Sequence, residues 1–248
     1  MEGPGFWAAA VLASVFVGLS KGGLPMVGML SVPVLALQIS PVTAAGLLLP
    51  VYVVSDMFGL YAYRRAFDRR VFAVVAIGAT AGVAFGWATA SLVPEAWVTL
   101  LVGVIGVSFA LSRIAMRGRE VPARPARTGP GLFWGGVAGF TSFVSHSGGP
   151  PYQVYVLPLK LSKAAFAGTT TVTFTYINAI KLIPYAALGQ LNLASLKIAA
   201  LLMAPASAAV FLGVWLVRVL PEKVFFRVVI WALLALSAKL IWDGARGL

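Results

Sequence analysis

The chain has 248 residues, of which 60% are hydrophobic and 10% are charged, and its mean hydropathy is +0.94. Soluble domains average about 25% charged residues, so this composition excludes an ordinary soluble fold and indicates a polytopic membrane protein. The absence of cysteine excludes disulfides and thiol chemistry, and the single histidine, His146, excludes a histidine metal cluster.

The formal net charge of +12 is carried mainly by arginines in short segments between apolar runs. The positive-inside rule produces this distribution, because basic loops remain on the cytoplasmic side. We therefore expect the lipid bilayer as a partner, not nucleic acid, and a multi-pass membrane protein. The start, Met1-Glu2-Gly3, has no basic region before the first apolar run, so we expect no cleavable signal peptide.

The first half of the chain, residues 1–115, contains one short pair of apolar runs and then three long spans. Lys21-Gly22-Gly23 separates the two short runs, and a full crossing needs roughly 20 residues, so we expect a broken or re-entrant helix pair here. Glycines at spacing four in the second long span predict a face for close helix packing. The short runs are 6–20 and 24–39, the long spans are 42–63, 71–92 and 97–115, and the glycines are Gly78, Gly82 and Gly86.

The second half, residues 131–248, repeats the order of the first. Between the halves, residues 116–130 contain four arginines and three prolines, and we interpret them as a basic cytoplasmic linker. The short runs of the second half are 131–147 and 150–161, and its long spans are 164–188, 193–219 and 224–242.

Landmark residues recur in the same order in both halves, which favours an internal duplication and predicts one repeat in 1–115 and another in 131–248. The matches are Pro25 with Pro150 and Pro33 with Pro158 at an offset of 125, Asp56 with Asn178 and Tyr63 with Tyr185 at 122, and Pro94 with Pro221 at 127.

The basic loops predict how the chain crosses the membrane. We expect 64–70 and 116–130 on the cytoplasmic side and the turn at 93–96 outside. Following the chain from these loops puts both termini on the outer side and gives each half an odd number of crossings, which inverts the second half. The sequence therefore predicts an all-α integral membrane fold with two inverted-topology repeats, each a short broken or re-entrant helix pair plus three long transmembrane helices.

The segment Ser20-Lys21-Gly22-Gly23 places a lysine between two apolar runs, where a charge costs several kcal/mol and suggests a function. Pro25 suits the first turn of a following helix, whose free amides and dipole favour an anion. We expect Ser20, Lys21 and the amides of Gly22 and Gly23 to hold a small anion. The alternative is that Lys21 extends its ammonium group to the membrane interface.

The turn Ser145-His146-Ser147-Gly148-Gly149 stands at the corresponding position of the second half. Hydroxyl, imidazole and amide donors in one run suit an anion, so we predict that these five residues contribute to the same site. His146 is also a candidate for coupling transport to protons, because histidine titrates near neutral pH. The alternative is a packed polar side chain that bonds a neighbouring carbonyl.

Asp56 lies in a long span, where a carboxylate must be paired or protonated. Two interpretations remain open: Asp56 forms a helix–helix hydrogen bond or an ion pair with Lys21 or Lys181, or it carries protons.

One polar stripe runs along the span 164–188, formed by Thr171, Thr175, Asn178 and Lys181 at helical spacing. Such stripes can simply join helices through hydrogen bonds. A lysine in the stripe favours the lining of a transport path, so we predict that Thr175, Asn178 and Lys181 contact the substrate.

Two glycine-rich motifs resemble those of the TauE/SafE sulfite exporter family. The first is Gly18-Leu19-Ser20-Lys21-Gly22-Gly23, followed by Gly28 and Pro33, and the second is Ser147-Gly148-Gly149-Pro150-Pro151, followed by Pro158. The resemblance covers nearly the whole chain and departs after Gly23, where Leu24-Pro25-Met26-Val27 replaces further glycines. It implies a small, duplicated, all-helical carrier of sulfite, thiosulfate or sulfonates in bacterial inner membranes.

We therefore predict a secondary transporter that holds a small sulfur-containing anion near the bilayer midplane, between the two breaks, and moves it by alternating access. The alternatives are an organic carboxylate transporter of the same architecture and a membrane scaffold that transports nothing. A scaffold has no need for Lys21, Asp56 and Lys181 at lipid depth. No acidic pair, metal-ligand set or nucleotide motif indicates an enzyme or a cofactor.

Overall fold

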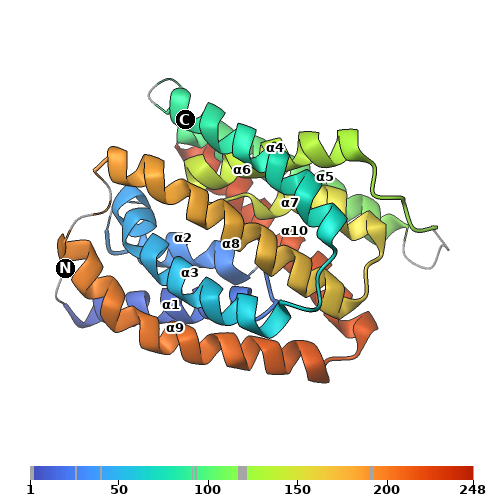
Figure 1. Cartoon of the computed structure of the whole chain (residues 1–248). Helices are drawn as coiled ribbons and strands as arrows, with labels where there is room; N and C mark the ends of the chain where they lie inside the picture. Colours follow the sequence, from blue (N-terminus) through green and yellow to red (C-terminus); the bar gives the residue numbers. More distant parts are fainter. Residues whose placement is uncertain are drawn as a thin grey trace. The chain divides into compact units, whose positions relative to one another are not determined.

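The structure is a computed structural model, and the described part of the chain is helical, with no strand (Figure 1). The described residues are 3–25, 27–39, 41–90, 92, 94–116, 122–189, 191 and 193–247. The α-helices are α1 (Pro4–Lys21), α2 (Ser31–Leu35), α3 (Pro41–Tyr63), α4 (Arg69–Ala88), α5 (Glu95–Ala115), α6 (Thr128–Ser145), α7 (Gly149–Val156), α8 (Lys163–Ala187), α9 (Leu193–Val219) and α10 (Glu222–Arg246). Two short 3₁₀ helices, η1 (Val27–Leu30) and η2 (Leu157–Leu159), precede α2 and follow α7.

The apolar runs predicted the positions of the long helices within a few residues at each end. The segment 24–39 differs from the prediction, because Pro25 lies in a turn and does not start a helix. The chain continues as η1, a 3₁₀ helix, before α2 begins at Ser31. Pro150, in contrast, does lie in the first turn of α7, where a missing amide hydrogen costs nothing.

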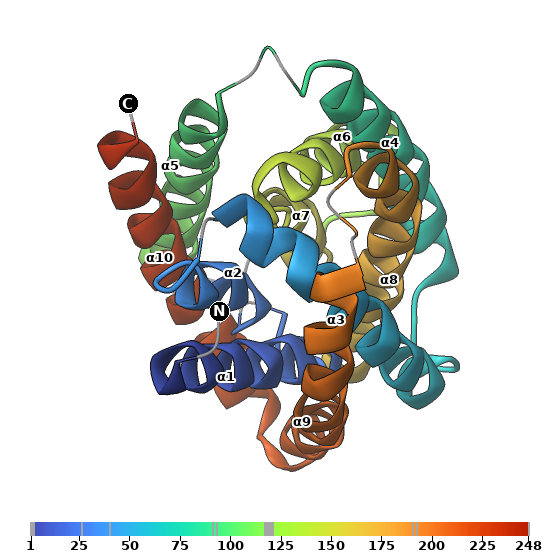
Figure 2. The same cartoon turned by 90° about the vertical axis from the view of Figure 1, so that its left-hand side faces the viewer.

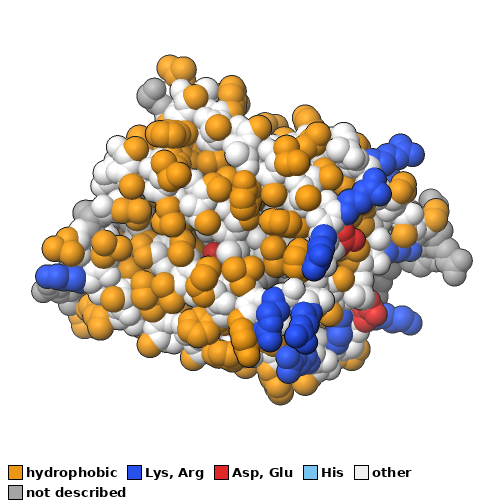
Figure 3. All heavy atoms as spheres, viewed as in Figure 1, with side chains coloured by type: hydrophobic (Ala, Val, Ile, Leu, Met, Phe, Trp, Pro, Cys, Tyr) orange, Lys and Arg blue, Asp and Glu red, His pale blue; other side chains and the backbone are white. Residues whose placement is uncertain are grey.

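Five helices of the described residues are long and apolar enough to cross a membrane, and they support the predicted membrane protein. Large hydrophobic side chains on these helices face outward, as they do over much of the surface in Figure 3. An apolar surface of this kind suits contact with lipid. The five spans are Pro4–Lys21, Thr43–Tyr63, Arg69–Ala88, Ser195–Val219 and Glu222–Arg246.

The chain forms two compact units that do not coincide with the two halves of the sequence. The first unit combines residues 1–67 with 167–220, and the second combines 68–166 with 221–248. Each unit therefore contains segments from both predicted repeats. The boundaries of the repeats remain a prediction, because a repeat and a compact unit are different divisions of the chain.

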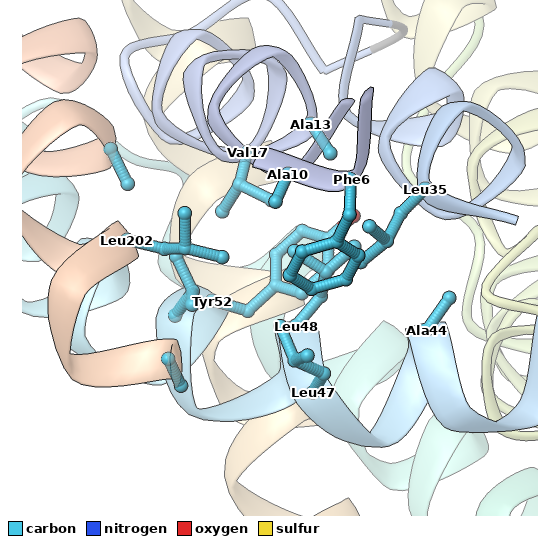
Figure 4. Close-up of a cluster of buried hydrophobic side chains, with 13 residues drawn as sticks. Phe6, Ala10, Ala13, Val17, Leu35, Ala44, Leu47, Leu48, Tyr52 and Leu202 are labelled. Carbon is cyan, nitrogen blue, oxygen red and sulfur yellow. The ribbon is translucent and has the colours of Figure 1, made fainter. Parts of the chain in front are cut away.

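In the first unit, the segment from α1 to α2 turns back on itself. A side chain at Gly5, near the start of α1, would lie 3.4 Å from Oε1 of Gln38, which follows α2. The chain thus returns to the level at which α1 begins. Apolar side chains of α1, α2, α3 and α9 form the core that holds this hairpin, with Phe6, Val17 and Leu202 among them (Figure 4).

Helix α1 crosses α9 at backbone contact distance (Figures 1 and 2). A Cβ atom at Gly18 would lie 2.0 Å from the carbonyl oxygen of Ala206, and one at Gly22 would lie 2.4 Å from that of Val210. Residue numbers rise together along both helices, so α1 and α9 run parallel. Only glycine permits this approach at the two α1 positions.

In the second unit, α6 crosses α4 in the same way. Gly78 and Gly82 of α4 face the backbone of α6, and Gly135 and Gly139 of α6 face the backbone of α4. The two helices again run parallel. The glycine spacing in α4 therefore marks a helix-packing face, as predicted from the sequence.

The chain also turns back after α6. The hydroxyl of Tyr155 in α7 donates a hydrogen bond to the carbonyl of Arg127, just before α6, at 3.1 Å. The amide of Arg124 donates to the carbonyl of Pro158 in η2 at 3.0 Å. The α6–α7 segment therefore folds back on itself within its unit, as α1–α2 does.

Internal prolines occur in three helices, and all three lie in the first unit. They are Pro50 in α3, Pro184 in α8 and Pro205 in α9. Each removes one backbone hydrogen bond from its helix, which is the usual cause of a bend.

We expect Gly82→Ala to lower the free energy of unfolding by about 1–3 kcal/mol, the usual cost of overpacking. The new Cβ would lie 2.0 Å from the carbonyl oxygen of Gly136, so α4 and α6 must separate. Gly129→Ala is the matched control, because no atom lies within 4 Å of a Cβ there. Thermal unfolding in detergent measures both, and equal stability of the two variants would contradict the close crossing.

Candidate functional site

A buried cluster of charged and polar side chains lies inside the first unit, at the end of α1 and along α3 and α8. The Nζ atom of Lys21, the last residue of α1, lies 2.8 Å from Oδ1 of Asp56 in α3. Asp56 is fully buried and Lys21 is 4% exposed. The structure contains the ion pair between Lys21 and Asp56, which is one of the interpretations open at the sequence level.

Two side chains of α8 complete the contacts of the Asp56 carboxylate. The Thr175 hydroxyl lies 3.0 Å from Oδ1, and Nδ2 of Asn178 donates to Oδ2 at 3.0 Å. Thr171, one turn earlier, donates to the carbonyl of Lys21 at 3.3 Å. The polar stripe of α8 therefore faces Lys21 and Asp56, and hydrogen bonds join α8 to both α1 and α3.

Two tyrosines contribute to the cluster that the sequence analysis did not assign to it. The ammonium group of Lys21 lies 5.0 Å from the centre of the Tyr52 ring, and that of Lys181 lies 5.8 Å from the centre of the Tyr185 ring. Both distances suit cation–π attraction. Each tyrosine is four residues from a charged residue of the cluster on the same helix, Asp56 or Lys181, and this spacing could have identified them.

The end of α1 is held in place by α3 and by close packing. The hydroxyl of Tyr63 donates to the carbonyl of Gly22 at 2.6 Å. Gly23 has a φ of +109°, which L side chains rarely adopt, and a Cβ there would lie 2.5 Å from the Tyr63 hydroxyl. These contacts direct the Lys21 side chain from the end of α1 toward Asp56.

The amides of Gly22 and Gly23, like the Ser20 hydroxyl, donate hydrogen bonds within the chain, and their role in anion binding remains a prediction. The amide of Gly22 donates to the carbonyl of Gly18, and that of Gly23 donates to the carbonyl of Ser20. The Ser20 hydroxyl likewise donates to the carbonyl of Val17 at 2.6 Å. Hydrogen bonds within the chain therefore take up these donors, and the glycines serve the crossing of α1 with α9.

The predicted turn of the second half lies in the second unit. His146 follows α6 with a left-handed φ of 53°, and its amide donates to the carbonyl of Ser142. Ser147, Gly148 and Gly149 are buried, and the amide of Ser147 donates to the carbonyl of Thr141. The side chain of Ser145 is outside the described part of the structure. A role for this turn in anion binding remains a prediction.

Gln153 in α7 is a further polar residue that the sequence analysis did not single out. Its side chain is fully buried, and neither Nε2 nor Oε1 has a hydrogen-bond partner among the described residues. Native proteins leave few buried polar groups without partners. The signal in the sequence is a single amide in the apolar segment that follows Pro150-Pro151.

The buried side chains of the first unit include more positively charged than negatively charged groups. Lys21 and Lys181 are both buried, and Asp56 is the single acidic residue of the unit within the described residues. With all three side chains ionised, the cluster carries a net charge of +1. An anion is the ligand that such a cluster attracts.

One protein-family model, described as Sulfite exporter TauE/SafE, matches residues 8–240 of the chain. The matched range contains the α6–α7 pair, the α1–α2 pair except for the first four residues of α1, and every residue of the buried cluster. No match was found among curated proteins or solved structures.

We expect Lys21→Met to lower the free energy of unfolding by about 3–5 kcal/mol, because it leaves the Asp56 carboxylate buried without its cation. The double variant Lys21→Met/Asp56→Asn should recover much of this loss. Lys239→Met is the control, since it breaks an exposed pair with Asp243 that is worth less than about 1 kcal/mol. Thermal unfolding in detergent tests this, and an equal loss in both single variants would contradict the buried pair.

Proposed function

Because the chain belongs to the sulfite exporter TauE/SafE family, a family of membrane transporters, we propose that it carries a small sulfur-containing anion such as sulfite, thiosulfate or a sulfonate. One observation carries the proposal: two lysines and an aspartate are buried together among helices α1, α3 and α8. Charged groups in such segments are costly and mark substrate or ion pathways. A net charge of +1 favours an anionic substrate.

The proposed binding residues are Lys21, Thr175, Asn178 and Lys181. Lysines supply charge, while the hydroxyl and the amide donate hydrogen bonds that orient an oxyanion. All four are within the first unit and are buried.

The proposed mechanism is alternating access of two inverted-topology repeats in a bacterial inner membrane. In this proposal both termini lie on the outer side and the basic loops lie on the cytoplasmic side. Equivalent helix pairs support the duplication: α1 lies on α9 in one unit and α6 lies on α4 in the other, both parallel and both at glycine contacts. The sequence offset of the repeats relates α1 to α6 and α9 to α4. Each unit also contains one helix pair that folds back on itself, and we propose that these pairs are re-entrant, as in such carriers.

An organic carboxylate is a second candidate substrate, because the donors of the cluster already bind a carboxylate, that of Asp56. A flux and binding screen in proteoliposomes separates the two classes. It compares sulfite, thiosulfate, methanesulfonate, sulfoacetate, sulfate and simple carboxylates. Preference for a sulfur oxyanion supports the first proposal, preference for a carboxylate supports the second, and absence of flux for every anion overturns both.

We expect Lys181→Met to lower flux of the preferred anion by about tenfold or more, because one ion pair at low dielectric is worth at least about 1.4 kcal/mol. Lys197→Met is the matched control, since Lys197 is exposed on α9 and should leave flux unchanged. Size-exclusion profiles and melting temperatures establish that both variants fold. Undiminished flux in folded Lys181→Met would remove this residue from the site.

A further inference from the structure

We infer that the Asp56 carboxylate occupies the anion site in the empty carrier, and that the substrate replaces it as Asp56 takes up one proton. The inference rests on the proposed function and adds to it how anion binding is coupled to protons. It starts from one fact: three of the four residues proposed to bind the substrate contact Asp56.

The carboxylate of Asp56 has the contacts that an oxyanion would need. Lys21 and Thr175 approach Oδ1 at 2.8 Å and 3.0 Å, and Asn178 donates to Oδ2 at 3.0 Å. A sulfite or sulfonate group likewise presents several oxygens on one central atom to such donors. A substrate that uses these donors must therefore displace the carboxylate from them.

The surroundings leave the displaced carboxylate few ways to remain ionised. Lys21 faces the Asp56 carboxylate from α1, Tyr52 lies on α3 like Asp56, and Lys181 lies near the carboxylate on α8. Helix α2 carries no charge, and the two cations of α9, Lys197 and Arg218, are exposed. Once Lys21 binds the substrate, a buried carboxylate without its cation is strongly unfavourable.

Protonation removes that cost. The carboxylate accepts one proton from solvent and becomes a carboxylic acid, while the substrate stays unchanged and enters as an ion. For a monovalent anion, the substrate replaces the charge that Asp56 loses, so the cluster keeps its net charge of +1. Binding therefore takes up one proton per anion.

The experiment counts protons during binding. Calorimetric titrations of the purified protein with thiosulfate and with methanesulfonate, whose charges are fixed between about pH 5 and 8, are run in buffers of different ionisation enthalpy. We expect an uptake of about one proton per anion in the unaltered protein and of none in Asp56→Asn. Asp243→Asn, which removes an exposed carboxylate on α10, is the matched control and should take up one proton like the unaltered protein.

The outcomes separate this inference from the proposed function. Anion binding without proton uptake in the unaltered protein overturns the inference alone. Proton uptake that persists in Asp56→Asn also overturns it. Binding of neither anion at any pH overturns the proposed function as well. Should Asp56→Asn fail to fold, the proton count of the unaltered protein still decides.

Discussion

The cost of placing lysines at the depth of a lipid bilayer dominates the first unit. Two ammonium groups are buried there with one carboxylate, and no isolated ion is stable in such surroundings. The unit meets this constraint with an ion pair, two hydrogen bonds from α8 to the carboxylate, and tyrosine rings near both lysines. Helices α1, α3 and α8 are thereby joined by polar contacts, and apolar side chains of α1, α2, α3 and α9 form the core of the unit.

Close helix crossings allow Lys21 and Asp56 to meet. Gly18 and Gly22 let α1 lie directly on the backbone of α9, and Tyr63 binds the last turn of α1 from α3. The charged end of Lys21 reaches Asp56 only because α1 ends where it does. The same use of glycine in the crossing of α4 with α6 shows that both units solve the packing of parallel helices in one way.

Hydropathy predicted the long helices well, because span length and apolar composition are local properties. Charged and polar residues within the apolar spans also identified Lys21, Asp56, Asn178 and Lys181. Two ion-pair partners remained possible for Asp56, since that choice depends on helices far apart in sequence. The hydrogen bonds that the Gly22 and Gly23 amides make within the chain were not predicted, because they depend on how far the last turn of α1 continues. The sequence also did not predict which segments form each compact unit, since residues 167–220 join the first unit only through tertiary contacts.

The three internal prolines of the first unit create positions at which its helices can bend. Pro50 lies six residues before Asp56, and Pro184 lies three residues after Lys181. A helix flexes most easily where a backbone hydrogen bond is missing. Slight bending of α3 or α8 at these prolines would therefore change the distance between Asp56 and Lys181. Because each proline lies within two helical turns of its charged residue, the shape of the helices affects the electrostatic potential inside the unit.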